Sequence, residues 1–112
     1  MKKIEAIIRP EKLNDVKIKL SNIDVQGMTV SNVMGFGKQK GYTQIYRGQE
    51  IETKLLPKIK LEVVVPTEKV DIVVAAIAEI SKTGKFGDGK IFVYDVLDAI
   101  RIRTGEHGEN AL

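Results

Sequence analysis

The two halves of the chain repeat one hydrophobic pattern at an offset of 57 residues, which limits the folds open to it. Apolar and polar residues alternate over residues 4–8 and 61–65, which is typical of strands with one buried face. Over residues 13–23 and 70–80, apolar residues recur at spacings of three and four, which indicates amphipathic helices. The matched pairs are Ile4 and Leu61, Ala6 and Val63, Ile8 and Val65, Leu13 and Val70, Val16 and Val73, Leu20 and Ile77, and Ile23 and Ile80. The pattern predicts two equivalent β-α halves.

Local signals agree with these helix positions. Pro10 suits the first turn of a helix, because its missing N–H would have no helical partner there. Thr67 is the expected N-cap of the second helix, and Glu68 follows it at the positive end of the helix dipole. Gly27 and Gly84 follow the two helical stretches and are expected to end them.

A second strand completes each half, over residues 28–34 and 90–96. The resulting order, β-α-β-β-α-β, predicts an α+β, ferredoxin-like sandwich in which two helices cover one face of an antiparallel sheet. Residues 1–112 are enough for a single domain with its own core. About twenty residues, from 35 to 56, separate strands two and three, although a hairpin needs only two to five. We expect a flexible, functional loop there.

Composition argues against several classes of protein. The chain has no cysteine, so disulfides and thiolate metal sites are excluded and a reducing, cytoplasmic location is favoured. No apolar run approaches the ~18 residues of a membrane span. The formal net charge of +3 is too small to indicate nucleic-acid binding. The one histidine, His107, lies in a polar tail, and no catalytic or metal-ligand spacing is present, so we predict no catalytic residues and no enzyme.

Two motifs carry groups that suit anions. In TGKFGDGKIFV, residues 83–93, the N–H groups of a glycine turn can form an anion-binding nest with Lys90 at its rim. A β-turn with glycine at positive φ explains the same residues without any ligand. Near the C-terminus, Arg101 and Arg103 point to the same side if the segment is extended, and paired guanidinium groups suit phosphate or carboxylate. A charged edge strand that prevents aggregation is the alternative.

Taken together, five stretches resemble the PII nitrogen regulatory signal-transduction proteins over the whole length of the chain. They are MKKIEAIIRPEKL, GMTVSNVMGFGKQKG, YRGQE, TGKFGDGKIFV and IRIRTGE. The resemblance implies a homotrimer with a site at each subunit interface for which ATP and ADP compete. It also implies that 2-oxoglutarate binds next to Mg-ATP.

The resemblance assigns roles to particular residues. The nucleotide-binding residues it implies are Thr29, Gly37, Lys38, Gln39, Val64, Gly87, Asp88, Gly89, Lys90, Arg101 and Arg103. Gln39 would also bind Mg²⁺, a hard cation that takes oxygen ligands and commonly rests on phosphates. Gln39 and Lys58 would bind 2-oxoglutarate, Lys58 by pairing with a carboxylate.

The long loop, about residues 37–55, corresponds to the T-loop with which this family docks onto its targets. Tyr42, Tyr46 and Arg47 are the expected partner contacts, and Arg47 resembles the loop-tip arginine that plugs a channel mouth. The implied partners are an ammonium transporter and enzymes or regulators of nitrogen metabolism. The protein would then be cytoplasmic and reach the inner face of the plasma membrane only through a transporter.

The loop also departs from the family pattern. Ile51 occupies the position of the tyrosine that relatives uridylylate, and Gln49 replaces a serine that some relatives phosphorylate. Control by ligands alone is therefore expected. Lys38 replaces a frequent arginine, which keeps the charge but loses the bidentate fork.

Two other functions fit the same element order less well. An RRM-like RNA-binding module also reads β-α-β-β-α-β, but its aromatic motif belongs on strand three, and KIKLEVVV contains no aromatic residue. A slow ATPase is the other alternative, although no candidate base stands out.

Overall fold

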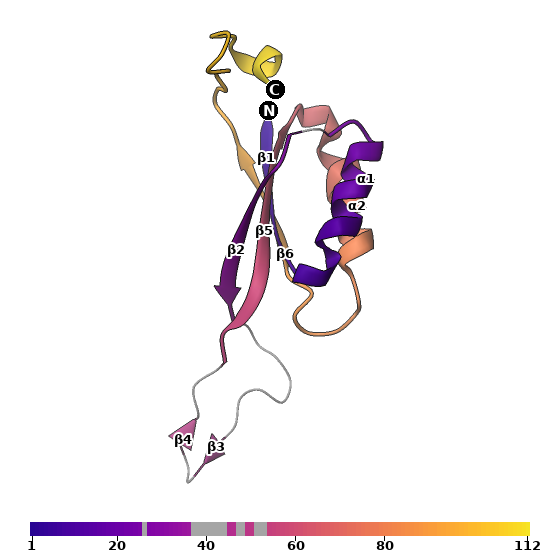
Figure 1. Ribbon diagram of the computed structural model, residues 1–112, viewed down its shortest axis with the longest axis vertical. Coiled ribbons are helices and arrows are strands. Elements are labelled where there is room, and N and C mark those ends of the chain that lie inside the picture. Colours follow the sequence, from indigo (N-terminus) through magenta and orange to yellow (C-terminus); the bar gives the residue numbers. More distant parts are fainter. Residues whose placement is uncertain (26, 37–44, 47–48, 51–53) are drawn as a thin grey trace.

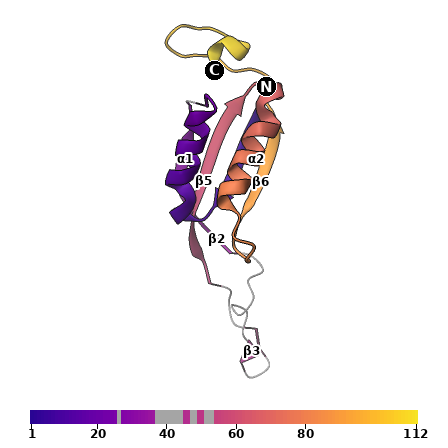
Figure 2. The same ribbon diagram turned by 90° about the vertical axis from the view of Figure 1, so that its right-hand side faces the viewer.

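The computed structural model describes residues 1–25, 27–36, 45–46, 49–50 and 54–112, and of residues 45–46 and 49–50 it describes only the backbone pairing. The elements are β1 (Lys2–Ile8), α1 (Leu13–Asn22), β2 (Thr29–Gly35), β3 (Ile45–Tyr46), β4 (Gln49–Glu50), β5 (Leu56–Val65), α2 (Val70–Ser81) and β6 (Lys90–Asp95). Four strands form an antiparallel sheet in the order β2-β5-β1-β6, and β3 pairs with β4. Both helices cover one face of this sheet (Figures 1 and 2). The predicted ferredoxin-like α+β fold is confirmed, and both predicted second strands are correct to within one residue.

The core lies between this sheet face and the two helices. Alternate residues of β1 and β5 are buried, and the paired positions Ile4 and Val63, and Ala6 and Leu61, lie side by side in the sheet. All seven matched pairs of the 57-residue repeat belong to the core or pack against it. The repeat therefore predicted the packing correctly, because its apolar periodicity marks the face that each element buries.

Both helices begin with a 3-10 turn that a proline introduces. Pro10 opens the turn before α1, as predicted, and Pro66 precedes the turn before α2. The prediction of Thr67 as an N-cap is wrong, because Pro66 takes the capping position, with φ of −55° and ψ of 147°. The Thr67 hydroxyl instead accepts a hydrogen bond of 3.2 Å from the amino group of Met1.

The opposite face of the sheet carries a network of charged side chains. The Lys60 ammonium lies 3.7 Å from a carboxylate oxygen of Glu5 and 3.9 Å from one of Glu62. The Lys3 ammonium pairs with Glu62 at 3.5 Å and lies 4.7 Å from the centre of the Tyr94 ring. The two ammonium groups and the two carboxylates of this network balance in charge, so the network supplies no excess positive charge for a phosphate backbone, which weakens the RNA-binding alternative.

Among the described residues, no helix has the length and apolar character needed to cross a lipid bilayer.

Candidate functional site

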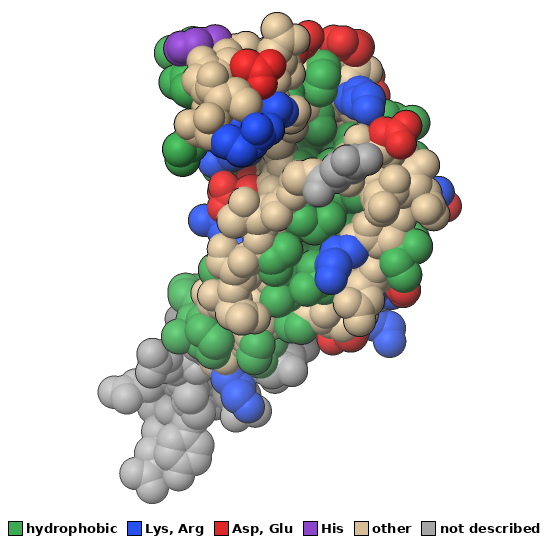
Figure 3. Space-filling model, turned by 45° about the horizontal axis from the view of Figure 1, so that its top comes forward, with side chains coloured by type: hydrophobic (Ala, Val, Ile, Leu, Met, Phe, Trp, Pro, Cys, Tyr) green, Lys and Arg blue, Asp and Glu red, His purple; other side chains and the backbone are tan. Residues whose placement is uncertain are grey.

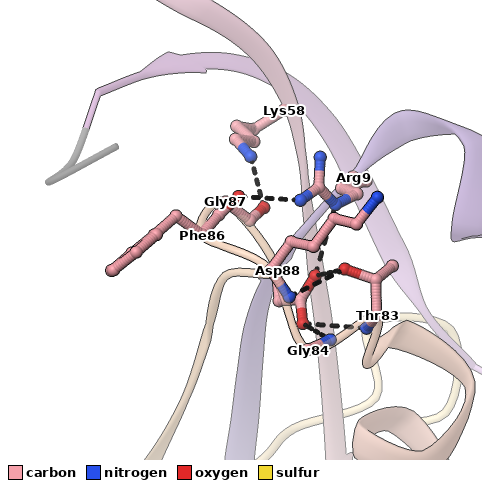
Figure 4. Close-up of polar contacts among 8 residues, drawn as sticks. Arg9, Lys58, Thr83, Gly84, Phe86, Gly87 and Asp88 are labelled. Carbon is pink, nitrogen blue, oxygen red and sulfur yellow. Dashed lines mark hydrogen bonds and ion pairs between the residues drawn. The ribbon is translucent and has the colours of Figure 1, made fainter. Parts of the chain in front are cut away.

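The glycine turn between α2 and β6 is organised around the carboxylate of Asp88. This carboxylate accepts hydrogen bonds from the backbone N–H groups of Thr83, at 2.8 Å, and Gly84, at 2.9 Å, and from the Thr83 hydroxyl (Figure 4). Gly87 and Gly89 have φ of +100° and +101°, so the predicted turn with glycine at positive φ is confirmed. The N–H groups of Thr83 and Gly84 do bind an anion, but that anion is the turn's own aspartate.

Two cations reach this turn from the sheet. The guanidinium of Arg9, just beyond β1, donates to the Phe86 carbonyl at 2.8 Å and lies 3.3 Å from an Asp88 oxygen. The Lys58 ammonium, from β5, donates to the Gly87 carbonyl at 2.6 Å. Figure 4 shows both cations pointing at the turn, with the Phe86 ring directed away from it. Contacts from two strands and the end of α2 thus hold one short loop.

Gly89 brings the turn against β1 more closely than any side chain would allow. A Cβ atom at this position would lie 1.7 Å from the carbonyl oxygen of Ile7, well inside van der Waals contact. Glycine is therefore required here both for its positive φ and for the approach of two backbones. Immediately after it, Lys90 pairs with Ile7 at the start of β6.

The turn presents positive charge while its own negative charge is engaged. Hydrogen bonds, first from the Thr83 hydroxyl and then from the N–H groups of Thr83 and Gly84, hold the pKa of Asp88 well below its ordinary value against the opposing effect of burial. Burial lowers the pKa of Lys58, and the charge of Arg9 lowers it further, while Glu11 and Asp88 act in the opposite direction. Lys58 and Lys90 thus lie beside a turn whose single carboxylate is already bonded, which favours an anionic ligand.

A separate cleft lies at the other end of the sheet, where β2 begins and β5 ends. It has a volume of about 650 Å³ and includes Thr29 and Val64 in its lining. Met28 and Leu112 add apolar walls, and Glu62 adds a carboxylate. Apolar walls with a few polar groups suit a flat organic ligand such as a nucleobase.

The segment with the two predicted arginines is not extended, so that expectation is wrong. Residues 102–104 form a turn, and the N–H of Gly105, at φ +74°, donates to the Arg101 carbonyl at 2.7 Å. The Arg101 guanidinium donates to Glu106 at 3.1 Å and to the Leu112 carbonyl at 3.0 Å, which keeps it near the cleft. Figure 3 brings this end forward, with Lys and Arg side chains in blue next to the segment that the purple histidine marks. Gly105, in the left-handed region, thus allows the chain to turn back here. The spacing of the two arginines gave no sign of this turn.

The predicted site residues therefore fall into two groups at opposite ends of the chain's sheet. The cleft end, with the C-terminal hairpin of residues 98–108, contains Thr29, Val64, Arg101 and Arg103. The glycine turn contains Gly87–Lys90 and is contacted by Lys58. Lys58 and Val64 are six residues apart in β5, which is about 20 Å at the rise of a strand. The other residues for which the sequence predicted a role lie outside the described part of the chain. They are Gly37, Lys38, Gln39, Tyr42, Arg47, Ile51 and the side chains of Tyr46 and Gln49.

Sequence reasoning missed two residues that hold the turn. Arg9 was visible only as a cation at the end of the first strand, and nothing in its neighbourhood along the chain indicated a partner 79 residues away. Thr83 was part of the recognised motif, but its bonds to Asp88 depend on how the turn folds back. Within the described part of the chain, no group of three or more His, Cys, Asp or Glu side chains is arranged to hold a metal ion.

Comparison with known proteins gives a consistent result over the full chain. A family model described as "Nitrogen regulatory protein P-II" matches residues 1–106. A nitrogen regulatory protein P-II of Haemophilus influenzae is 61% identical over 112 residues, covering all of both chains. The nitrogen regulatory protein P-II of Pasteurella multocida is 59% identical, and nitrogen regulatory protein P-II 1 of Escherichia coli K12 is 54% identical, with the same full coverage.

Proposed function

The chain belongs to the nitrogen regulatory protein P-II family, and on that premise we propose that it senses ATP, ADP and 2-oxoglutarate and regulates ammonium transport and nitrogen metabolism through its long loop. The observation that carries this proposal is the turn at Gly87–Lys90, which Arg9, Lys58 and Thr83 hold in place. A rigid turn bordered by lysines suits the phosphates of a nucleotide, because such a site needs little reorganisation when the ligand binds.

In this proposal Asp88 positions the turn and does not itself contact phosphate. A carboxylate facing a phosphate would be repelled, and the Asp88 oxygens already accept hydrogen bonds from Thr83 and Gly84. The groups that would meet the ligand are the backbone of Gly87 and Gly89 and the ammonium of Lys90. Asp88 thus acts through the shape of the turn.

The separation of the two residue groups supports a site built from two copies of the chain. The cleft with Thr29 and Val64 would receive the adenine and ribose, and the glycine turn of a neighbouring copy would receive the phosphates. A closed ring of copies repeats such a head-to-tail interface, and the family resemblance implies a ring of three. Exposed Leu97 and Ile102, at 99% and 100% of their accessible surface, support burial against another copy.

The 2-oxoglutarate site would adjoin the same turn. The Lys58 ammonium would pair with a carboxylate of the keto acid, either in place of its hydrogen bond to the Gly87 carbonyl or in addition to it. Mg²⁺ would rest on triphosphate oxygens and on Gln39, which lies outside the described residues. ADP lacks the γ-phosphate, so it would support the metal and the keto acid poorly. ADP on the one hand, and ATP with Mg²⁺ and the keto acid on the other, would therefore stabilise different states of the protein.

The output would be a ligand-dependent interaction with a target. Tyr42, Tyr46 and Arg47 are the proposed contacts with an ammonium transporter or a nitrogen-metabolism enzyme or regulator. Because Ile51 has no hydroxyl, the ligands alone would control this interaction. The protein would act in the cytoplasm and approach the membrane only through a transporter. Its relatives are named as regulatory proteins, in keeping with a role in signalling and not in catalysis.

Calorimetry tests the ligand part of the proposal. ATP should bind without other effectors, and 2-oxoglutarate should bind only when Mg²⁺ and ATP are both present. Equal binding of 2-oxoglutarate in the absence of Mg-ATP would exclude the shared site. A phosphate-release assay on the same samples checks the ATPase alternative, which requires steady turnover that a substitution at Lys90 abolishes.

Subunit mixing tests whether two copies share one site. The variant Val64→Arg blocks the cleft half, and the variant Lys90→Glu reverses the charge of the turn half. Each variant alone should bind no ATP, whereas a co-refolded equimolar mixture should regain about a quarter of the sites if every site joins halves from two copies of a ring. A mixture as inactive as its parts would place both halves within one chain.

A further inference from the structure

One carboxylate closes the open end of the C-terminal hairpin, which we define as residues 98–108. Asp98 Oδ1 accepts hydrogen bonds from the N–H groups of Ala99, at 2.8 Å, and Gly108, at 3.1 Å. Asp98 Oδ2 lies 2.8 Å from Nδ1 of His107, so the imidazole donates through that nitrogen. A single side chain on one arm of the hairpin thus holds two residues of the other arm.

The backbone of the hairpin continues from this point toward its turn. The Gly108 N–H donates to the Ala99 carbonyl at 2.9 Å, Ile100 pairs with His107, and the Arg101 N–H donates to the Glu106 carbonyl at 2.9 Å. Arg101 and Arg103 lie at the closed end. The contact between His107 and Asp98 therefore closes the loop that carries both arginines.

The hairpin depends on its own bonds, since its side chains are largely exposed. The His107 and Asp98 side chains retain 66% and 48% of their accessible surface. The hydrogen bond from His107 is the first cause that lowers the pKa of Asp98, with the Ala99 N–H next, so the carboxylate remains ionised and a strong acceptor at neutral pH.

We propose that His107 and Asp98 form a clasp that positions Arg101 and Arg103 for an anionic ligand. This inference rests on the proposed function, in which the two arginines bind nucleotide phosphates. His107 acts through Asp98 and touches no ligand, so it is a positioning residue. Opening the clasp would let the arginines sample other positions, and ordering them again would weaken binding.

The test compares variants of the whole protein that remove or preserve the donor. His107→Ala and Asp98→Ala break the clasp, whereas His107→Asn retains a donor, since the amide nitrogen of asparagine lies close to the place of Nδ1. Glu109→Gln removes a charge one residue beyond the hairpin and leaves both residues of the clasp unchanged. ATP affinity should fall about fivefold in both alanine variants, which is the size expected for one ordinary, exposed hydrogen bond that acts on the ligand only indirectly, and should stay within about twofold in the other two.

Nuclear magnetic resonance supplies a readout that does not depend on ATP. In the wild type at pH 8, His107 should be in the Nδ1-protonated tautomer, and the Gly108 amide should exchange slowly with solvent. Both signatures should disappear in Asp98→Ala, and slow exchange should persist in His107→Asn. An Nε2-protonated tautomer in the wild type would show that the clasp does not exist.

The remaining outcomes separate the two proposals. If the alanine variants lose the amide protection but bind ATP as the wild type does, the clasp shapes only the hairpin and the positioning role is wrong. If the wild type binds no ATP, the proposed function fails and the ligand role of the clasp fails with it, while the amide and tautomer signals still report whether the clasp forms.

Discussion

The ammonium of Lys58 donates a hydrogen bond of 2.6 Å to the carbonyl of Gly87, which joins the central strand β5 to the turn that precedes β6. The two residues are 29 positions apart in the sequence. This contact connects the proposed keto-acid site to the proposed phosphate turn, and Arg9 repeats it on the neighbouring carbonyl of Phe86. Removing either cation should therefore disturb the turn as well as the local charge.

Lys58→Met removes the ammonium and keeps most of the aliphatic stem. The affinity for 2-oxoglutarate in the presence of Mg-ATP should fall at least about tenfold, since a hydrogen bond to a charged group is lost. ATP affinity should change less, because the turn retains Arg9 and Thr83. Calorimetry measures both constants. Lys17→Met on the exposed side of α1 is the matched control, and equal losses in the two variants would contradict a specific role for Lys58.

Gly89→Ala should destabilise the fold by more than about 3 kcal/mol, because strain at positive φ adds to a steric clash. The new Cβ would lie 1.7 Å from the Ile7 carbonyl oxygen. Urea unfolding gives the free energy. Gly105→Ala separates the two causes, since Gly105 has φ +74° but no atom within 4 Å of the new Cβ, so it should lose only about 1 kcal/mol. Equal losses would mean that the close approach to β1 has no effect.

Acid should weaken the turn in a defined range of pH. The pKa of Asp88 is lowered in the folded state, chiefly by the Thr83 hydroxyl, so its contribution to stability is complete above the ordinary pKa near 4 and is lost as the pH falls toward the lowered value. The free energy of unfolding of the wild type should therefore fall steadily below about pH 4. Thr83→Val should show a shallower fall over that range, and parallel curves for the two proteins would contradict the assignment.

The internal repeat predicts paired effects in the core. Val16 and Val73 occupy matched positions in α1 and α2 and are 1% and 0% exposed. Replacing either by alanine should cost about 2 kcal/mol of unfolding free energy, from lost burial and the cavity left behind. The nearby Ile18 and Ile72 are 61% and 53% exposed, so the same truncation there should cost under about 0.5 kcal/mol. A large asymmetry between Val16 and Val73 would show that the two halves are not energetically equivalent.

The element order and the buried faces could be predicted from the sequence because both depend on local periodicity. Ile4 and Leu61 mark the buried face of a strand, and Val16 marks that of a helix, wherever those elements lie in space. A turn with glycine at positive φ was one of two interpretations of the glycine spacing, and the φ values of Gly87 and Gly89 agree with it. The assignment of Thr67 as a cap failed at the same local level, because proline one residue earlier constrains the backbone more strongly than a hydroxyl does.

The composition of the site depended on the tertiary structure. Arg9 meets Asp88 across 79 residues because β1 pairs with β6, and no pattern along the chain reports such a pairing. The extended backbone of β5 places Val64 and Lys58 near opposite ends of that strand, so residues that the family resemblance groups together lie apart in one chain. The sequence by itself determined the two β-α halves and the residue types available for binding an anion. Only the tertiary structure decided which of those residues meet, since strand order and register are set by packing of the whole chain.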